Sequence, residues 1–414
     1  MLRDLEINIS LKREKFLIFL LAGIQFSHIV DFVVLMPLGP ILMRTLSITP
    51  LQFGTLVSSY NISAAVTGLL YGIIADKYDR KFMLQINFVG FILGTIACGI
   101  AKDYESLILA RVIAGGFGGT LTAVVLAMVS DLVPFQRRGN AMGIVMSSFS
   151  IASVLGVPIG LYIAEKFNWH YTFFFIAAFS SVILIVSSVS FPKLTMHIKK
   201  INPKESLSRL FALLLKKDYL KSYGLVFFNV FSIFTLIPYL SPFSVKNLAI
   251  AETDLKYMYF IGGFFTVITS RIVGLLTDRF GAFRVMMGLI FISVIPIYLF
   301  TSATKVSFFF FIAISTFFMT MISGRMIPLM TMVSEIADSE DRGTFMGLLN
   351  SIRSLGSALA TVFAGFFIVE TSSGKLEGFD QMGYFSIGVG LALIFGCAHI
   401  YKILLRVQSE RKVA

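Results

Sequence analysis

The sequence is divided into long apolar stretches separated by short polar segments. Twelve stretches of about 18 to 27 residues are each long enough to cross a hydrocarbon core of about 30 Å as a helix. Because 56% of the 414 residues are hydrophobic and only 14% are charged, the chain has too little polar surface for a soluble protein of this size. We therefore predict an all-α membrane protein. The predicted spans are 16–42, 52–75, 82–100, 104–129, 138–164, 170–191, 219–246, 255–277, 284–301, 306–333, 342–370 and 381–405.

The basic residues predict how the helices are oriented. If both termini are cytoplasmic, most of the 35 Lys and Arg fall in cytoplasmic segments, as the positive-inside bias requires. The net charge of +12 then records topology and does not indicate nucleic-acid binding. We expect the basic opening segment to lead into the first span and not to be a cleaved signal, because the apolar run continues through Asp31 and Pro37 without a cleavage site. We expect the bacterial inner membrane.

A short motif occurs twice in the chain. The line GIIADKYDRK begins at Gly72, and GLLTDRFGAFR begins 202 positions later at Gly274. A second group, from Asp131 to Gly143, recurs 204 positions later. Such a repeat is typical of transporters built from two similar membrane halves, with a site where the halves meet. The predicted parts are an N-terminal six-helix bundle (1–191), a cytoplasmic linker (192–218) and a C-terminal six-helix bundle (219–414).

The linker is rich in Lys and is expected to lie on the membrane surface. Four apolar side chains share one predicted helical face against lipid headgroups. They are Leu207, Leu210, Phe211 and Leu214.

The repeated motif carries charges at the membrane surface between glycines that permit a tight interhelical turn. It resembles the loop between the second and third helices of the major facilitator superfamily, and the likeness covers essentially the whole chain. The resemblance implies two six-helix bundles that rock about a central site, and an Asp76 that pairs with an Arg to hold the outward-open state. Arg138 is the candidate partner and Arg137 the alternative. A generic hairpin with snorkelling charges is the competing interpretation.

Eight residues form the candidate inner gate under this resemblance. They are Gly72, Asp76, Arg80, Lys81, Arg138, Asp278, Arg279 and Arg342. The second copy departs from the first by one inserted residue between Asp278 and Arg284, which weakens the assignment of its role.

The fourth and fifth spans contain two further family-like signatures. Arg111 precedes a small-residue face and resembles the fourth-helix Arg that is implicated in proton transfer in the family; the alternative is an Arg that only joins helices. In the fifth span, Gly156-Val-Pro158-Ile-Gly160 allows a bend with close packing. It resembles the antiporter signature of the twelve-helix drug and sugar efflux branch, although Val157 interrupts the usual Gly-Pro pair.

Asp31 lies about halfway along the first span, with His28 one turn earlier on the same face. Because hydrocarbon disfavours a charged carboxyl, Asp31 is a candidate to load and release a proton. Related efflux proteins carry an acidic residue in the first helix, so the resemblance points to the same role. The alternatives are a structural Asp31 neutralised by Arg111, and a His28 that serves only in packing.

The second half of the chain has two arginines deep in apolar spans, Arg325 in the tenth and Arg353 in the eleventh. With Asp31 as the one central carboxylate, the cavity should be net positive and favour anionic or zwitterionic substrates. The alternative is that carbonyl groups at helix ends compensate the positive charge. The candidate cavity residues are Arg325, Arg353, Asn350, Ser357, Asn61, Asn229 and Tyr239.

Taken as a whole, the sequence predicts a twelve-helix major facilitator transporter that resembles proton-coupled efflux antiporters. The expected partners are a small-molecule substrate, protons and membrane lipid, and we expect a monomer. A proton- or anion-coupled importer of a small organic anion or lysolipid is the alternative. Four scattered His and two Cys do not form an enzyme centre or a metal site, so no cofactor is expected. A channel would instead show rings of like residues around a pore.

Overall fold

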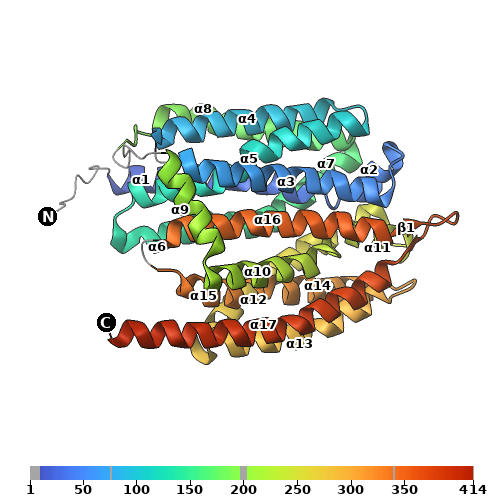
Figure 1. Ribbon diagram of the computed structural model, residues 1–414. Helices are drawn as coiled ribbons and strands as arrows, with labels where there is room; N and C mark the ends of the chain where they lie inside the picture. Colours follow the sequence, from blue (N-terminus) through green and yellow to red (C-terminus); the bar gives the residue numbers. More distant parts are fainter. Residues whose placement is uncertain (1–9, 75–76, 196–202, 339–340, 414) are drawn as a thin grey trace.

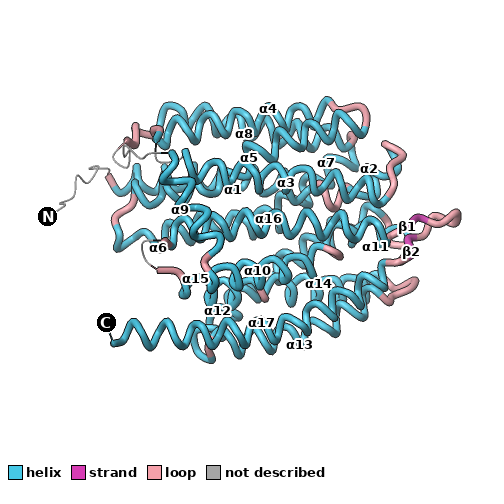
Figure 2. The backbone as a smooth tube through the Cα atoms, in the orientation of Figure 1, coloured by secondary structure: helices cyan, strands magenta, loops and turns pink. Residues whose placement is uncertain are grey.

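The structure, a computed structural model, describes residues 10–74, 77–195, 203–338 and 341–413, and these are almost entirely helical (Figures 1 and 2). Ten helical segments are long and apolar enough to cross a membrane. Two more, α3 (Pro50–Ile74) and α16 (Arg342–Phe367), have 25 and 26 residues and each span about 38 Å at 1.5 Å per residue. The described residues thus contain the twelve predicted spans.

Each half of the chain forms a compact group of helices. The N-terminal half contains α1 (Leu11–Val34), α2 (Gly39–Thr45), α3, α4 (Arg80–Ile100), α5 (Tyr104–Leu132), α6 (Phe135–Ile151), the π-helical turn η2 (Ala152–Gly156), α7 (Val157–Lys166) and α8 (Trp169–Ser190). The C-terminal half contains α10 (Lys217–Phe234), η3 (Ile237–Tyr239), α11 (Leu240–Lys246), η4 (Glu252–Asp254), α12 (Leu255–Phe280), α13 (Ala282–Thr301), α14 (Phe308–Gly324), α15 (Met326–Ile336), α16, β1 (Val369–Glu370), β2 (Leu376–Glu377) and α17 (Phe379–Val413).

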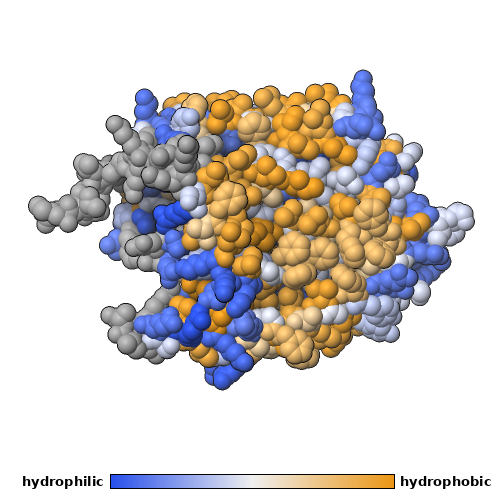
Figure 3. Space-filling view, in the orientation of Figure 1, coloured by the Kyte–Doolittle hydropathy of each residue, from blue (hydrophilic) through white to orange (hydrophobic). Residues whose placement is uncertain are grey.

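The two ends of the bundle differ, and we name them by their landmarks. The linker end carries α9 (Pro203–Leu215), the start of α1 and the end of α17, while the hairpin end carries the antiparallel strands β1 and β2 (Figure 1). A band of apolar side chains separates hydrophilic surfaces at these two ends (Figure 3). Val189 and Phe309 are each 84% exposed, as expected of side chains that face lipid.

Polar residues mark the ends of the helices. Asp103 caps α5, because its carboxylate accepts from the backbone N–H of Ser106 at 2.8 Å and the Ser106 hydroxyl faces the Asp103 N–H. Asn168 caps α8 in a similar way through the N–H of His170. Gly281, with φ of 87°, supplies the left-handed residue between α12 and α13.

Proline residues account for the interruptions within the spans. The first span breaks between α1 and α2 at Pro37, and the seventh breaks at Pro238. Pro158 follows the π-helical turn η2, in which Val157 donates to the carbonyl of Ala152. Pro328 has no N–H for the carbonyl of Gly324, which is where α14 ends. Each proline removes one helical hydrogen bond, so the helix bends at that point.

The two halves meet mainly through α3 and α16, which lie side by side in the middle of the molecule (Figure 1). The Ser58 hydroxyl of α3 donates to the carbonyl of Ala358 in α16 at 2.8 Å. On another side, α12 packs against η2 and α7. A Cβ added to Gly263 of α12 would lie 3.2 Å from the backbone of Ser153, so the bent fifth span directly contacts the other half.

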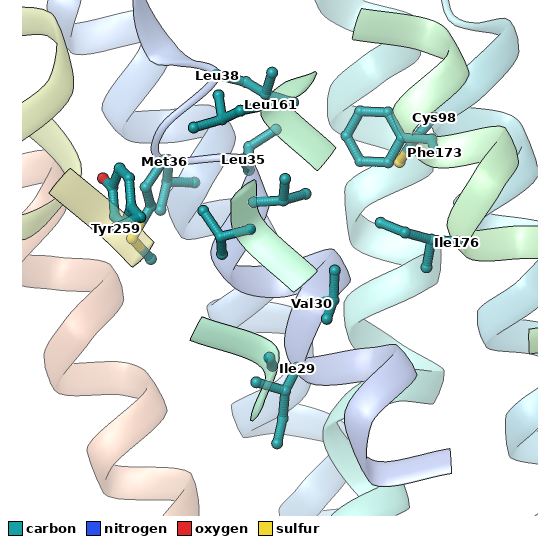
Figure 4. Packing of buried hydrophobic residues seen from close by; sticks show 14 of the residues in the cluster. Ile29, Val30, Leu35, Met36, Leu38, Cys98, Leu161, Phe173, Ile176 and Tyr259 are labelled. Atoms are coloured by element: carbon teal, nitrogen blue, oxygen red, sulfur yellow. The ribbon is translucent and has the colours of Figure 1, made fainter. Parts of the chain in front are cut away.

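The halves are packed together at the hairpin end. One continuous apolar cluster runs through the N-terminal half, and at the hairpin end it joins Met36 and Leu38 to Tyr259 from α12 (Figure 4). At the linker end, buried residues of the C-terminal half form a separate cluster, although Leu69 of α3 packs against it. The structure therefore has its hairpin end closed.

The helix in the linker differs from the surface segment that we predicted. Leu207 and Phe211 of α9 are exposed, as expected of a lipid-facing side. Leu210 is buried, and Leu214 packs with it in the apolar cluster at the linker end. Two of the four predicted side chains therefore face outward and two pack against the protein, because α9 also contacts α3, α10 and α16.

Candidate functional site

The structure places Asp31 in contact with Arg111. The Nη1 atom of Arg111 lies 2.7 Å from Oδ2 of Asp31, and both side chains are 0% exposed. The Thr95 hydroxyl of α4 lies 3.2 Å from the other carboxylate oxygen. The pair joins α1 to α5 in the interior of the N-terminal half. This arrangement matches the alternative in which Arg111 neutralises Asp31, and it leaves proton transfer untested.

Aromatic and small residues surround this ion pair. The guanidinium of Arg111 lies 4.6 Å from the centre of the Tyr60 ring, within the range of a cation–π contact. The Cys98 thiol lies beside it. Because Gly115 has no side chain, α5 approaches α3 so closely that an added Cβ would lie 2.3 Å from the carbonyl oxygen of Tyr60. Glycines of the fourth span therefore seal the pair between helices.

His28 belongs to a second polar cluster, one turn from Asp31. Its Nε2 atom lies 3.1 Å from the Thr122 hydroxyl, and the Gln25 amide also donates to that hydroxyl at 3.1 Å. His28 and Thr122 are half-buried, whereas Gln25 is buried and its Oε1 atom has no partner in the described part of the chain. The cluster is therefore open on one side, where His28 and Thr122 border a space that the protein does not fill.

Arg353 borders the same space from the other half. Its side chain is exposed although it lies deep among the helices, and it interacts electrostatically with His28. Its Nη2 atom donates to the carbonyl oxygen of the Asn350 side chain at 2.7 Å. The polar stripe continues along α16 through Ser357, which is buried and bonds to the carbonyl of Ser354. Arg353 thus lies within electrostatic range of α1 in the other half.

Arg325 lies elsewhere than predicted. It is 1% exposed at the break between α14 and α15, and its Nη2 contacts the Ser293 hydroxyl of α13. An added Cβ on Gly390 of α17 would lie 3.5 Å from the guanidinium. The side chain therefore points into the C-terminal half and away from the N-terminal half. Sequence could not give this direction, because α14 is apolar on all sides and does not reveal its rotation.

Three other predicted cavity residues are also buried. Tyr239 lies at the closed hairpin end, where its hydroxyl is 3.1 Å from the carbonyl of Pro50 and 3.0 Å from that of Thr361. It joins the two halves there and does not line a central site. Asn229 is buried beside Met326, and Asn61 is 5% exposed on α3.

The predicted bend motif packs against α1. A Cβ added to Gly156 would lie 2.3 Å from the Val30 side chain, and one added to Gly160 would lie 2.7 Å from Val34. Pro158 follows the π-helical turn between them. Val30 is adjacent to Asp31, so the bend and the buried ion pair share one helix.

The inner-gate residues lie at the linker end. Asp76 lies outside the described residues, so its pairing with Arg138 or Arg137 stays a prediction. Arg80 contacts Asp131 at 2.5 Å, and Arg138 donates to the carbonyl of Ser130 at 2.6 Å. The others occupy helix ends: Gly72 in α3, Lys81 in α4, Asp278 and Arg279 in α12, and Arg342 at the start of α16. Arg137 binds Glu14 at 2.6 Å, a partner that the sequence did not suggest.

Sequence reasoning also missed two ion pairs that join the halves at the hairpin end. Arg44 of α2 pairs with Glu252 of η4. Lys256 of α12 pairs with Glu165 of α7 at 2.9 Å. The partners are far apart in the chain, so no local pattern could have paired them.

The chain matches the Major Facilitator Superfamily over residues 21–361 and again over 223–413. It belongs to that superfamily. A Bacillus subtilis relative, the uncharacterized MFS-type transporter YceJ, is 26% identical over 381 residues, covering 88% of this chain and 93% of the relative. Multidrug resistance protein 2 of the same organism is 22% identical over 366 residues, covering 86% and 90%. The superfamily consists of transporters, so the protein is a membrane transporter and not an enzyme.

Solved structures confirm the major facilitator fold. A bacterial homologue of the human lysosomal transporter Spinster, in an inward-facing and occupied conformation, superimposes with a TM-score of 0.77 at 15% identity. That comparison covers 96% of this chain and 99% of the homologue. The nucleoside transporter NupG gives a TM-score of 0.74 at 15% identity, covering 94% and 100%. At these identities the likeness concerns the fold alone.

Proposed function

We propose that the protein is a proton-coupled antiporter that exports a small organic or amphipathic substrate by alternating access. It acts as a monomer in the bacterial inner membrane, with the linker end and both termini on the cytoplasmic side. The observation that carries the proposal is the fully buried ion pair of Asp31 and Arg111. A carboxylate at that depth can exchange its charge for a proton, and the exchange changes what holds α1 to α5.

Protonation of Asp31 would remove the attraction to Arg111. The guanidinium remains charged and would be left without its carboxylate partner, so the arrangement of α1 against α5 loses its main electrostatic support. An alternative arrangement of the helices, with the guanidinium nearer to water, then becomes favourable. This is how a proton would shift the population between two states of the transporter.

The bend motif offers a contact route from Asp31 to the other half. Val30, next to Asp31, fills the space left by Gly156, and the π-helical turn in front of that glycine packs against Gly263 of α12. A movement of α1 at Asp31 would therefore press on the bend and through it on the C-terminal half. The bend occurs in the first half only, because α16 runs without interruption from Arg342 to Phe367.

Export is supported by likeness and not by geometry. Multidrug resistance protein 2 matches this chain over most of its length, and the Gly156–Gly160 segment resembles the antiporter signature. The second candidate is an importer of a small organic anion. The exposed Arg353 supports an anionic substrate for this candidate, but the same side chain would bind an anion in either direction of transport.

The sign of proton movement tests the proposal. Purified protein is reconstituted into liposomes that contain the pH dye pyranine, and ligands first found by thermal shift are added outside. Antiport makes the interior more alkaline as substrate enters and protons leave, whereas symport makes it more acidic. Asp31→Asn should bind ligand but move no protons. Glu105→Gln, which removes an exposed carboxylate from α5, is the matched control and should behave as the natural protein.

If the ligand makes the interior of the liposomes more acidic, the protein is a symporter and the proposed antiport is wrong. Proton movement that persists in Asp31→Asn would remove Asp31 from the mechanism.

A further inference from the structure

We infer that the transported substrate carries an anionic group, and that Arg353 of α16 and His28 of α1 bind this group in the space between the halves. The inference rests on the proposed transport function and adds the class of substrate. Both residues lie near the middle of their spans, one in each half, and they are close enough for the charge of Arg353 to act on the His28 ring. A ligand bound there touches both halves, as a substrate that drives rocking must.

The charge of Arg353 has no carboxylate partner in the described part of the chain. Its one hydrogen bond goes to the neutral side chain of Asn350. The neighbouring helix α3 has no charged residue from Pro50 to Ile74, and Asp218 at the start of α10 is held by Arg406. Asp31, the central carboxylate, is 0% exposed and is held by Arg111. The space therefore carries an uncompensated positive charge, which attracts anions and repels cations.

The hydrogen bonds around His28 leave a donor available. The Gln25 amide donates to the Thr122 hydroxyl, and one arrangement lets that hydroxyl donate in turn to Nε2 of His28. The ring then carries its proton on Nδ1. That N–H has no partner in the part of the chain that the structure describes. His28 can thus donate to the same anion as Arg353.

The geometry suits a carboxylate or a phosphate group. The planar guanidinium can form two parallel hydrogen bonds to such a group, which the ammonium of Lys reproduces poorly. Ala123, the residue after Thr122 on α5, is small and exposed, so this part of the helix leaves room for the rest of the ligand.

Charged thiol reagents measure the charge of this space without a known substrate. Cys98 and Cys397 are replaced by Ala, and Ala123→Cys supplies the reporter. The anionic reagent MTSES and the cationic reagent MTSET are compared by their rates of reaction. We expect a preference for the anionic reagent that falls about fivefold or more in Arg353→Gln. The matched control Arg271→Gln, which removes a charge from the exposed part of α12, should leave the ratio unchanged.

Either of two results overturns the inference. The reporter cysteine reacts with neither reagent, which means that no water-filled space exists there, or the ratio of rates does not respond to Arg353→Gln. These measurements need no transport, so they succeed or fail independently of the proton assay.

Ligand chemistry gives a second test. Thermal shift compares phenylacetate, phenylacetamide and 2-phenylethylamine, which share a skeleton and differ in charge. We expect the acid to stabilise the protein most, and at least a tenfold loss of apparent affinity in both Arg353→Lys and Arg353→Gln. Preferential stabilisation by the amine, or an acid effect that survives in Arg353→Gln, contradicts the inference. If the protein then moved a cation in exchange for protons, the proposed transport function would hold and only the anion site would be wrong.

Discussion

At the scale of single residues, three arginines within the membrane spans have three different surroundings. Arg111 is neutralised by Asp31 at 2.7 Å, Arg325 is buried against a neutral hydroxyl, and Arg353 has an exposed side chain. The sequence predicted that all three are deep, because each lies inside an apolar span. It offered Asp31 as the partner of Arg111 only as an alternative, and it did not predict the surroundings of Arg325, since these depend on the rotation of each helix about its axis.

The two members of the buried ion pair should differ in how their removal responds to pH. Arg111→Gln leaves a buried carboxylate that can take up a proton and become neutral. Asp31→Asn leaves a guanidinium that cannot lose its proton. We expect each variant to lose about 3 kcal/mol of stability at neutral pH, and only the Arg111→Gln loss to shrink as the pH falls.

Thermal unfolding in detergent, followed by a maleimide dye, measures this difference, because Cys98 and Cys397 are both buried in the folded protein. The double variant should lose less than the sum of the two single losses. Equal pH responses of the two single variants would show that the pair does not behave as a buried ion pair.

At the scale of helices, the spans follow from hydropathy, whereas their close contacts do not. The sequence predicted the bend at Pro158, where a helical hydrogen bond is lost. It did not predict the breaks at Pro37 and Pro238, since a proline does not always break a helix: Pro296 lies inside the uninterrupted α13. The small-residue face after Arg111 predicted tight packing, and the structure identifies α3 as the neighbour. The hydrophobic pattern cannot name such a neighbour, because lipid and protein interior are equally apolar.

Two glycines in helices of the N-terminal half should respond oppositely to alanine. An added Cβ at Gly115 would lie 2.3 Å from a backbone carbonyl of α3, while nothing lies within 4 Å of one at Gly143. We expect Gly115→Ala to destabilise the protein by about 1 to 3 kcal/mol. Gly143→Ala should be neutral or stabilising by up to about 1 kcal/mol, because Ala favours helix. Melting temperatures in the same detergent measure both, and equal shifts would contradict the packing of α5 on α3.

At the scale of the whole molecule, the hairpin end is held by contacts that cross between the halves. Arg44 with Glu252 and Glu165 with Lys256 are both of this kind, as is the Tyr239 hydroxyl at the carbonyl of Pro50. These contacts must separate when the hairpin end opens. The sequence predicted charges only for a gate at the linker end, since the partners at the hairpin end are remote in the chain.

Reversing a charge across the hairpin end should open it. Glu165→Lys replaces an attraction to Lys256 with a repulsion, whereas the pair Glu165→Lys with Lys256→Glu restores attraction. Exposed pairs contribute about 0.2 to 1 kcal/mol, so we expect the open population to rise up to about fivefold. Spin labels at Lys102 and Lys305, one in each half, report the distance by pulsed electron paramagnetic resonance. Lys246→Glu is the control, because its partner Glu370 belongs to the same half.

Weakening the linker end should move the equilibrium the other way. If Asp76 pairs with Arg138 or a neighbour only when the linker end is closed, Asp76→Asn lowers the stability of that state alone. The population with a closed hairpin end then grows, and the longer distances between the labels at Lys102 and Lys305 lose intensity. Combining Asp76→Asn with Glu165→Lys should bring the distribution back toward that of the natural protein, because the two changes bias one equilibrium in opposite directions. A distribution that Asp76→Asn leaves unchanged would assign that residue to folding or topology and not to a gate.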